Sequence, residues 1–455
     1  MKLSALVARL GGRLVGDDVE LMSFSSDSRH LRAGDCFIAL RGPHFDAEQF
    51  LGQVQAAGAC AVVVRQEHPG LALPQWVVAD TLAALQGLAV CWREQFPALQ
   101  RIAITGSSGK TTCKQMLASV LSRQAATLAT VGNLNNDIGV PLTLLALRPE
   151  HRYAVLELGA NHVGEIAQTV AMVQPEIALI TNIGWAHFDG FGGRDGIARA
   201  KMEIYTGLQR GAAVIVNADD DYAEACQARA LELALRPVLV SLRDARAHLY
   251  ASAIEATGQA CFACRPVWHG QTLPRLQMNL PGLHNLSNAC LVLAVALELG
   301  IAADLAYAGL TSVEHVGGRL AITQRGSCTL IDDTYNANPA SCRAAIDVLA
   351  AQAGRKILVL GDMKELGSAA RQGHSEVGAW AKMKKIDALY TWGEHAEDYA
   401  AGYGETTRVC VDKSHLIREL QRELQGVVSV LVKGSRSARM EDVVQALLDD
   451  HVEKS

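Results

Sequence analysis

The strongest chemical signal in the sequence is a glycine-rich segment between an apolar strand and a helix. Residues 105–112 read TGSSGKTT, directly after the apolar run Arg101–Thr105 and before the helical pattern Cys113–Leu121. Such a turn exposes backbone N–H groups and the positive end of a helix to a phosphate chain. Lys110 would reach the terminal phosphates and the Thr111 hydroxyl would hold Mg²⁺. The spacing predicts a nucleotide-phosphate site, although Ile104 stands where the general motif has its first glycine.

Two candidate metal ligands follow other apolar strands. Glu157 lies at the end of Tyr153–Leu158, and His187 follows Ile177–Thr181. Carboxyl ends of parallel strands open onto one crevice, so both side chains are expected near the magnesium of a bound nucleotide. Taken singly, Glu157 is also explained as a solvated strand end and His187 as an ordinary loop histidine.

Polar segments also follow apolar stretches in the last third of the chain. They are Asp332–Pro339, Leu360–Gly367 and Lys433–Arg436. Open sheets bind ligands at the carboxyl ends of their strands, so three such segments at one edge predict a cleft. The last segment offers two cations to an anionic group.

Two other groups are ambiguous on physical grounds. Lys201 lies in an amphipathic helical pattern, where a solvated lysine beside Glu203 is the simplest interpretation. Asn285 and Asn288 lie near the start of the Ala- and Leu-rich segment Leu283–Leu299, where a helix cap at Asn288 or Ser287 is an equal alternative to a binding role. Composition alone favours the solvated lysine and leaves the asparagine case open.

The elements that would position these residues are strands alternating with helical patterns. At about 150 residues per domain, 455 residues suggest three domains. Continuous apolar strands separated by helices favour mostly parallel sheets covered on both faces. A small α/β module is expected over the first 80 residues, and a boundary between two larger α/β domains near Val313–Gly318. The expected strands are Cys36–Leu40, Ala59–Val64, Arg101–Thr105, Tyr153–Leu158, Ile177–Thr181, Ala212–Val216, Lys356–Leu360, Ala388–Trp392 and Val427–Val432.

Composition argues against several classes of protein. The formal charge is 42 − 47 = −5, which does not favour a broad grip on nucleic acid or anionic lipid. The strongest apolar run, Ala289–Leu297, is too short to cross a bilayer, and Arg9 interrupts the first apolar stretch before it reaches signal-peptide length. Eleven scattered cysteines indicate buried free thiols, because the pair Cys261 and Cys264 lacks a second pair at zinc-binding spacing. We expect a cytoplasmic protein.

Ten segments together resemble the Mur ligase family, over a span from Ser26 to Glu441. They are TGSSGKTT, ELGANHVGEI, TNIGWAHFDGFGG, IARAKMEI, VNADD, GLHNLSNA, GGR, IDDTYNANPAS, LGDMKELG and VKGSRSARME. The resemblance implies an α/β fold of three domains: a UDP-sugar domain (1–83), a central P-loop domain with a parallel sheet that binds ATP (84–314), and a Rossmann-like domain that binds D-alanyl-D-alanine (315–455).

The resemblance also implies a reaction. ATP phosphorylates the terminal carboxylate of UDP-N-acetylmuramoyl-tripeptide, and the amine of D-alanyl-D-alanine attacks the acyl phosphate, with two Mg²⁺ ions bound and the enzyme a monomer. Alternatives are a Mur ligase that adds the third amino acid, a folylpolyglutamate synthase, or a protein that binds ATP without ligation. The segment DDTYNANP argues against the first two.

Site residues follow from the resemblance alone. Those implied to contact the nucleotide are Gly106, Ser107, Ser108, Gly109, Lys110, Thr111, Thr112, Asn285, Asn288, Arg319, Asp333, Tyr335 and Asn336. The implied metal ligands are Thr111, Glu157, His187 and Lys201, the last if carbamylated, and the implied catalytic residues are Lys110, Lys201 and His187. The implied contacts to the UDP-linked substrate are Ser26, Asp27, Ser28, Arg29, Phe45 and Asp46, beside which Ala47 replaces the family's glycine.

Overall fold

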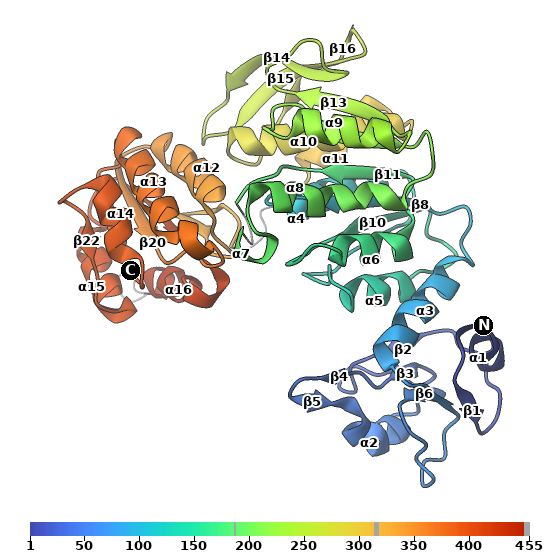
Figure 1. The fold of residues 1–455 in the computed structure, drawn as a ribbon. Coiled ribbons are helices and arrows are strands. Elements are labelled where there is room, and N and C mark those ends of the chain that lie inside the picture. Colours follow the sequence, from blue (N-terminus) through green and yellow to red (C-terminus); the bar gives the residue numbers. More distant parts are fainter. Residues whose placement is uncertain (186–187, 314–317, 450–455) are drawn as a thin grey trace.

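The chain folds into three α/β domains, each built around its own main sheet (Figure 1). The computed structural model describes residues 1–185, 188–313 and 318–449. The central domain lies between the other two, with the N-terminal domain below it in the view and the C-terminal domain to its left. The prediction of a three-domain α/β chain is confirmed.

The N-terminal domain is a five-stranded sheet with a small hairpin beside it. The sheet has the order β1 (Arg13–Val15), β7 (Gln75–Val77), β6 (Ala61–Val64), β3 (Cys36–Ile38) and β2 (Phe24–Ser25). Only the pair of β1 and β7 is antiparallel. The remaining elements are α1 (Leu3–Leu10), β4 (Arg41–Gly42), β5 (Phe45–Asp46), the 3₁₀ turn η1 (Ala47–Phe50) and α2 (Leu51–Ala56).

Helix α3 (Thr81–Arg93) connects the N-terminal and central domains. It begins at Asp80, whose carboxylate accepts hydrogen bonds from the N–H groups of Leu82 (2.8 Å) and Ala83 (3.2 Å). Its far end is tied to the central domain, because the guanidinium of Arg93 donates to the Met172 carbonyl at 2.6 Å. The expected boundary at residues 83/84 falls in the first turn of this helix.

The central domain contains a ten-stranded sheet that is parallel over most of its width. Its parallel part has the order β14 (Leu249–Ala256), β13 (Arg236–Ser241), β12 (Ala213–Asn217), β11 (Ile177–Ile180), β8 (Gln100–Thr105), β10 (Tyr153–Glu157) and β9 (Thr127–Ala129). The expected strands of this domain each agree with an observed strand to within one residue at either end.

Helices cover both faces of the central sheet because both faces are apolar. Successive residues of a strand point to opposite faces, and Ile102 and Ile104 of β8 accordingly pack in a different core cluster from Ala103. The first cluster contains α4 (Lys110–Ser122), α10 (Leu283–Glu298) and α11 (Ala303–Thr311). The opposite face packs against α5 (Gly139–Leu145), α6 (Glu165–Val173), α8 (Arg194–Met202), η2 (Glu203–Gly207) and α9 (Ala223–Glu232).

One edge of the central sheet is antiparallel, which the sequence did not lead us to expect. Strand β15 (Phe262–Trp268) pairs antiparallel with β14, β16 (Gln271–Thr272) and β17 (Leu276–Gln277). The pair Cys261 and Cys264 lies at the start of this extension, and all eleven cysteines of the chain are free thiols.

The C-terminal domain contains a six-stranded sheet whose strands are parallel except at one edge. The order is β18 (Ala321–Arg325), β19 (Cys328–Asp333), β23 (Val428–Lys433), β20 (Arg355–Leu360), β21 (Ala388–Thr391) and β22 (Arg408–Val409). One face packs against α12 (Pro339–Ala350), α13 (Ala370–Met383) and α14 (Ala396–Tyr403). The other face packs against α15 (Lys413–Glu423) and α16 (Glu441–Asp449).

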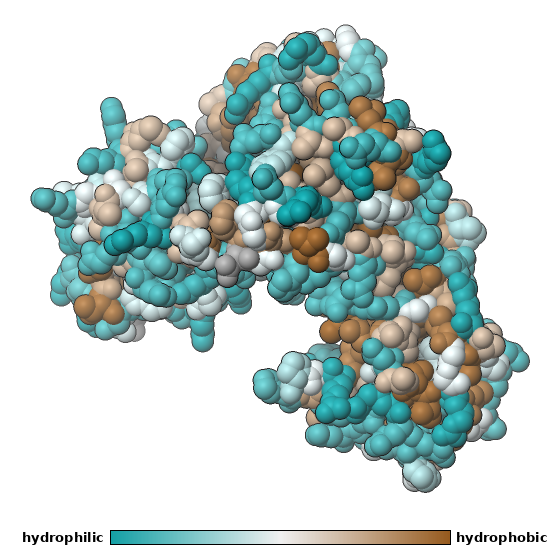
Figure 2. Space-filling view, viewed as in Figure 1, coloured by the Kyte–Doolittle hydropathy of each residue, from teal (hydrophilic) through white to brown (hydrophobic). Residues whose placement is uncertain are grey.

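The surface is polar, with scattered apolar side chains, and it is hollowed between the N-terminal and C-terminal domains in the view of Figure 2. Among the described helices, none combines the length and hydrophobicity that a bilayer-spanning segment needs.

Candidate active site

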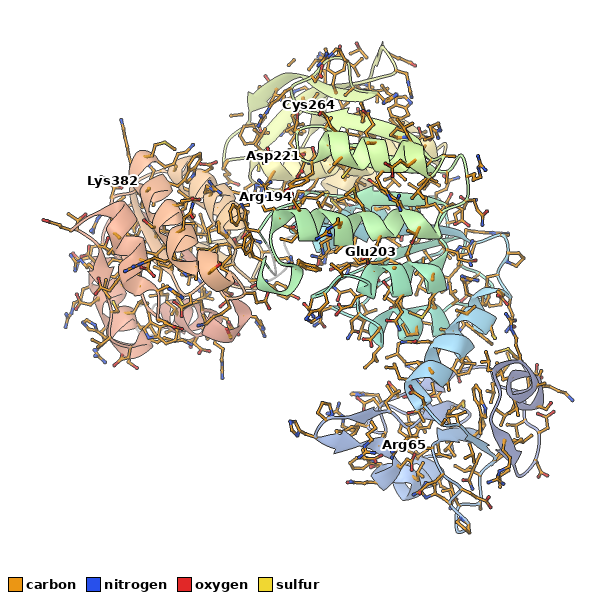
Figure 3. All side chains as sticks on the ribbon, in the orientation of Figure 1. Arg65, Arg194, Glu203, Asp221, Cys264 and Lys382 are labelled. Atoms are coloured by element: carbon orange, nitrogen blue, oxygen red, sulfur yellow. The ribbon has the colours of Figure 1, made fainter. Side chains whose placement is uncertain are left out.

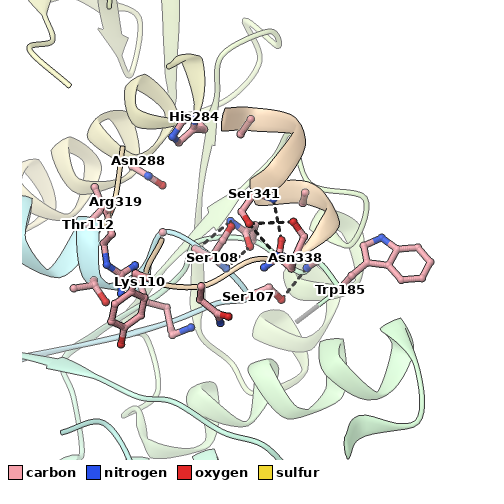
Figure 4. A pocket seen from close by; sticks show the side chains of 18 of the residues that line it. Ser107, Ser108, Lys110, Thr112, Trp185, His284, Asn288, Arg319, Asn338 and Ser341 are labelled. Atoms are coloured by element: carbon pink, nitrogen blue, oxygen red, sulfur yellow. Dashed lines mark hydrogen bonds between the residues drawn. The ribbon is translucent and has the colours of Figure 1, made fainter. Parts of the chain in front are cut away.

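A cleft of about 860 Å³ is lined by both the central and the C-terminal domain. The central domain supplies the segments 107–112, 159–161 and 182–185, and the C-terminal domain supplies 318–320 and the start of α12. Figure 4 shows Lys110, Thr112 and Arg319 grouped at one part of this cleft, with Ser341 of α12 and Asn338, the residue that caps this helix, in another. The carboxyl ends of β8, β10, β11 and β19 all lead to it, as expected for parallel sheets.

The glycine-rich loop connects β8 to α4 as its sequence predicts. Helix α4 begins at Lys110, so the N–H groups of its first turn have no partner within the helix, and its first residues line the cleft. The ammonium of Lys110 donates to the Gly106 carbonyl at 2.8 Å, which holds the side chain over the loop. Burial lowers the pKa of Lys110, while Glu157 opposes this shift.

Asn182 braces the loop from the end of β11. Its side-chain oxygen accepts from the Ser108 N–H (3.0 Å), and its side-chain NH₂ donates to the Ser108 hydroxyl (2.9 Å). Its backbone carbonyl accepts from the Ser107 N–H (3.0 Å). The Ser107 hydroxyl in turn accepts from the Gly184 N–H at 2.9 Å. Hydrogen bonds with Asn182 and Gly184 therefore fix the conformation of the loop.

Gly109 must be a glycine for two reasons. Its φ is +77°, and a Cβ at this position would lie 2.8 Å from the side-chain oxygen of Asn288 on α10. Asn288 is held from behind, since it donates to Asn285 at 3.3 Å and Asn285 donates to the Pro281 carbonyl at 2.7 Å. Helix α10 begins after Gly282, so Asn285 and Asn288 lie inside it, and the helix-cap alternative is wrong.

We expect Gly109→Ala to raise the KM for ATP at least about tenfold, because strain and the Asn288 contact displace the loop by a few tenths of an ångström or more. Steady-state kinetics at varied ATP concentration would measure this increase in KM. Gly211→Ala is the matched control, since Gly211 also has a positive φ (+82°) but open space around its Cβ position. Equal effects of the two changes would show that the Asn288 contact is unimportant.

Glu157 is buried at the end of β10 and both of its oxygens have partners. Oε2 accepts from the Thr111 hydroxyl at 2.9 Å, and Oε1 accepts from the Asn135 amide at 2.9 Å. The ammonium of Lys114, one helical turn after Lys110, lies 3.9 Å from Oε2 and donates to the Thr130 carbonyl at 2.7 Å. The interpretation of Glu157 as a solvated strand end is wrong.

The hydroxyl of Thr111 and the carboxylate of Glu157 suit a magnesium ion. Mg²⁺ binds oxygen donors and in nucleotide sites keeps one or two protein oxygens, with water and phosphate completing its shell. Both side chains line the cleft next to the phosphate loop. The described residues contain no group of three or more His, Cys, Asp or Glu side chains that could hold a metal, so phosphate oxygens would have to complete the site. His187 lies outside the described residues.

Lys201 is buried in the central domain, with its side chain 1 % exposed, so its interpretation as a solvated lysine is wrong. Its ammonium lies 5.5 Å from the ring centre of Phe191. Burial and, secondly, the charge of Lys110 lower the pKa of Lys201 to about 7. The carboxylate of Glu203 instead accepts hydrogen bonds from the N–H groups of Gly164 (2.7 Å) and Ala167 (3.0 Å). A buried lysine with so low a pKa is a neutral amine in a large fraction of molecules near pH 7.

The C-terminal domain closes the other side of the cleft with Arg319, Asp333, Tyr335 and Asn336. The guanidinium of Arg319 stacks on the Tyr335 ring at 3.9 Å from its centre. Lys433 is 2 % exposed and donates to Asp333 Oδ2 at 2.5 Å and to the Asn336 carbonyl at 2.8 Å. The charge of Lys433 is therefore neutralised by Asp333 within the C-terminal domain. Arg436 is exposed and pairs with Glu441.

We expect Lys433→Met to lower the free energy of unfolding by about 3–5 kcal/mol, because the change leaves the Asp333 carboxylate buried without its partner. Urea denaturation followed by circular dichroism measures this loss. Arg436→Met is the control, since its exposed ion pair with Glu441 contributes at most about 1 kcal/mol. Similar losses of unfolding free energy in the two variants would contradict a stabilising role of the buried Lys433–Asp333 pair.

The residues implied to contact the UDP-linked substrate do not line this cleft. They lie in the N-terminal domain, where Asp27 accepts hydrogen bonds from the Arg29 side chain that hold its pKa well below the usual range. Asp46 pairs with Arg65 at 2.7 Å, and Phe45 is 54 % exposed and stacks on Phe50. The structure does not bring this group together with the phosphate loop.

Several residues that line the cleft were not found from the sequence. Besides Asn182, they include Asn133, Asn135, Asn136, Arg194, Asp220, Asp221, Arg343 and Glu376. Arg194 lies next to Asp221 in Figure 3 and pairs with it at 2.8 Å. The asparagine run at 133–136, between β9 and α5, was a visible signal for a polar loop at a strand end.

The sequence is similar to known proteins over most of its length. Residues 104–296 match the Mur ligase middle domain and residues 318–436 match the glutamate ligase domain of Mur ligases. The chain is 42 % identical over 98 % of both chains to the UDP-N-acetylmuramoyl-tripeptide–D-alanyl-D-alanine ligase of Escherichia coli. The chain belongs to the Mur ligase family. The matched middle domain of this Mur ligase contains the whole phosphate loop (105–112) and Glu157.

Solved structures of Mur ligases share the whole fold. A crystal structure of MurF from Acinetobacter baumannii is 38 % identical, covers 98 % of both chains and has a TM-score of 0.91. A MurF ligase structure from Thermotoga maritima in complex with ADP, 24 % identical, covers 95 % of this chain and 98 % of its own with a TM-score of 0.84. The three-domain architecture is therefore that of the Mur ligases.

Proposed function

We propose that this Mur ligase joins D-alanyl-D-alanine to UDP-N-acetylmuramoyl-tripeptide in an ATP-dependent reaction, giving the UDP-linked pentapeptide used in peptidoglycan synthesis. The observation that carries the proposal is that a phosphate loop, the Glu157–Thr111 pair and the Arg319–Tyr335 pair converge on one cleft between two domains. The relative at 42 % identity over nearly the full chain bears the name of this activity.

ATP is assigned to the central side of the cleft. The free N–H groups at the start of α4 and the Lys110 ammonium would bind its phosphates, and Arg319 would reach them from the C-terminal domain. Asn285 and Asn288 line the cleft on α10 and would contact the adenine, with Asp333, Tyr335 and Asn336 on the opposite wall. The ADP complex of the Thermotoga ligase supports a nucleotide in this fold.

Thr111 and Glu157 would hold one Mg²⁺, and His187 with a carbamylated Lys201 would hold a second. Bound magnesium supplies neutralisation of phosphate charge during transfer. Lys201 is suited to carbamylation because its neutral amine can add to carbon dioxide, and the product is a carboxylate, a good magnesium ligand. We therefore assign catalytic roles to Lys110, Lys201 and His187.

The chemistry follows in two displacements. A carboxylate oxygen of the tripeptide attacks the γ-phosphorus of ATP and ADP leaves, which gives an acyl phosphate. The dipeptide amine then attacks the acyl carbon, phosphate leaves, and the nitrogen loses a proton to form the amide. Lys110 and Arg319 line the cleft and would face the phosphate that transfers and then departs.

The division of labour among the domains is part of the proposal. Residues 1–83 would bind the UDP sugar through Ser26, Asp27, Ser28, Arg29, Phe45 and Asp46, residues 84–314 would bind ATP, and residues 315–455 would bind the dipeptide. Because those N-terminal residues do not line the cleft, the N-terminal domain would approach the cleft for catalysis. We propose that the enzyme works as a cytoplasmic monomer, since one chain supplies every part of the cleft.

A product assay tests the function. Purified protein is incubated with ATP, Mg²⁺, UDP-N-acetylmuramoyl-tripeptide and labelled D-alanyl-D-alanine, or with a diamino acid and the dipeptide substrate of the preceding ligase. The proposal expects labelled pentapeptide, and phosphate release that requires both substrates. Product from the diamino acid instead, or phosphate release independent of the acceptor, would contradict it.

A further inference from the structure

Five cationic side chains line the cleft among the described residues, and two of them have anionic partners. They are Lys110, Arg194, Arg319, Arg343 and Lys433. Lys433 pairs with Asp333 at 2.5 Å, and Arg194 pairs with Asp221 at 2.8 Å. Three cations are therefore available to the anionic groups of substrates.

Lys110 and Arg319 belong to the phosphate part of the cleft. Both lie next to Thr112 in Figure 4. Because the two cations lie near each other there, the charge of Arg319 contributes to lowering the pKa of Lys110. Together with the start of α4, they face a polyphosphate.

Arg343 is the third available cation and comes from a different element, the second turn of α12. It is half-buried and forms no hydrogen bond or ion pair with the described part of the chain. The other polar side chains at this end of α12 are engaged with each other: Asn338 accepts from the Ser341 N–H at 2.9 Å, and the Ser341 hydroxyl accepts from the Asn338 N–H at 3.1 Å. Arg343 is thus the group that α12 presents to a ligand.

The wall around Arg343 has mixed charge. Glu376 of α13, the helix packed beside α12, also lines the cleft, and its carboxylate accepts from the Gln372 amide at 2.8 Å. His284 across the cleft is neutral near pH 7, because burial and Lys433 lower its pKa to about 4. One cation and one carboxylate on a single wall suit a zwitterion better than a triphosphate.

We propose that Arg343 binds the free C-terminal carboxylate of the incoming dipeptide and so selects a peptide acceptor with a charged end. A guanidinium matches a carboxylate with two parallel hydrogen bonds, and this group of the dipeptide takes no part in the reaction, so it is free for recognition. The proposal rests on the amide-ligase function above and adds the residue that recognises its second substrate.

Removing the charge of Arg343, or that of the dipeptide carboxylate, tests whether the two groups pair. Wild type, Arg343→Gln and the control Arg325→Gln are assayed with D-alanyl-D-alanine and with its C-terminal amide. Arg325 is an exposed arginine on β18 of the same domain, outside the cleft lining. We expect wild type and the control to prefer the carboxylate by about 10-fold to 100-fold in kcat/KM, and Arg343→Gln to lose this preference through a raised KM for D-alanyl-D-alanine.

The outcomes separate this inference from the function it rests on. A preference retained by Arg343→Gln, or a KM change that falls on ATP or the UDP-linked substrate, overturns the role of Arg343 while leaving the ligase intact. A wild type that forms no pentapeptide from D-alanyl-D-alanine removes both. If Arg343→Gln does not fold, Arg343→Lys replaces it, because lysine keeps the positive charge but cannot form two parallel hydrogen bonds. If Arg343→Lys prefers the carboxylate over the amide as strongly as wild type does, a bidentate contact is contradicted.

Discussion

Lys110→Ala is expected to reduce turnover at least about 10³-fold while leaving binding of the UDP-linked tripeptide nearly unchanged. The ammonium of Lys110 lies over the phosphate loop, and no other lysine lines the cleft among the described residues except Lys433, which is paired with Asp333. The residues assigned to the UDP sugar lie in another domain, so the two effects should separate. Initial rates and calorimetric titration with the UDP-linked substrate measure them.

The control for this change is Lys382→Ala. Lys382 is an exposed lysine of α13 on the outer side of the C-terminal domain, visible in Figure 3, and it should retain full activity. If Lys110→Ala also abolished UDP-substrate binding, the division of labour between the N-terminal and central domains would be wrong. If it kept more than a tenth of wild-type turnover, the phosphate role of Lys110 would be wrong.

The sheets were predictable because their signals are local. Buried parallel strands appear as continuous apolar runs, and Arg101–Thr105 differs from the observed β8 only by the addition of Gln100. The loop at 105–112 carries its glycines where backbone geometry demands them. The antiparallel strands β15 to β17 were missed because none of them is a continuous apolar run. Arg265 and Pro266 interrupt the seven residues of β15, and β16 and β17 have two residues each.

The site was less accessible because it depends on distant segments. Asn288 contacts the position of Gly109 across 179 residues of chain, and no local pattern reports such a contact. Arg343 was not singled out from the sequence either. That its side chain has no partner among the described residues becomes visible only when the ion pairs of the other residues that line the cleft are known.

Lys201 did carry a local signal that composition hides. Ile197, Ala200, Lys201 and Ile204 have the spacing of a buried helical stripe, and all four are buried. Arg199, two positions before Lys201, lies on the opposite side of the helix and is exposed. Periodicity therefore placed Lys201 inside, where a charged ammonium is costly. A lysine kept in such a stripe requires a chemical explanation.

Lys201→Ala is expected to lower turnover at least about 10³-fold and to regain part of it in added acetate. The carboxylate of acetate can occupy the position of the carbamate in the space that the shorter side chain leaves, and restore an oxygen ligand for magnesium. Arg199→Ala, an exposed change on the same helix, should keep its activity and show no response to acetate. Rates at increasing acetate concentration measure the recovery.

The carbamate itself can be observed. Wild type in ¹³C-labelled bicarbonate should show a carbamate resonance that Lys201→Ala lacks. Because the pKa of Lys201 is about 7, its neutral amine is lost as the pH falls below 7, and the resonance and the activity should decline together in that range. A wild type that is fully active without the resonance would rule out the modified lysine as a magnesium ligand, and Lys201 would then act as a buried amine.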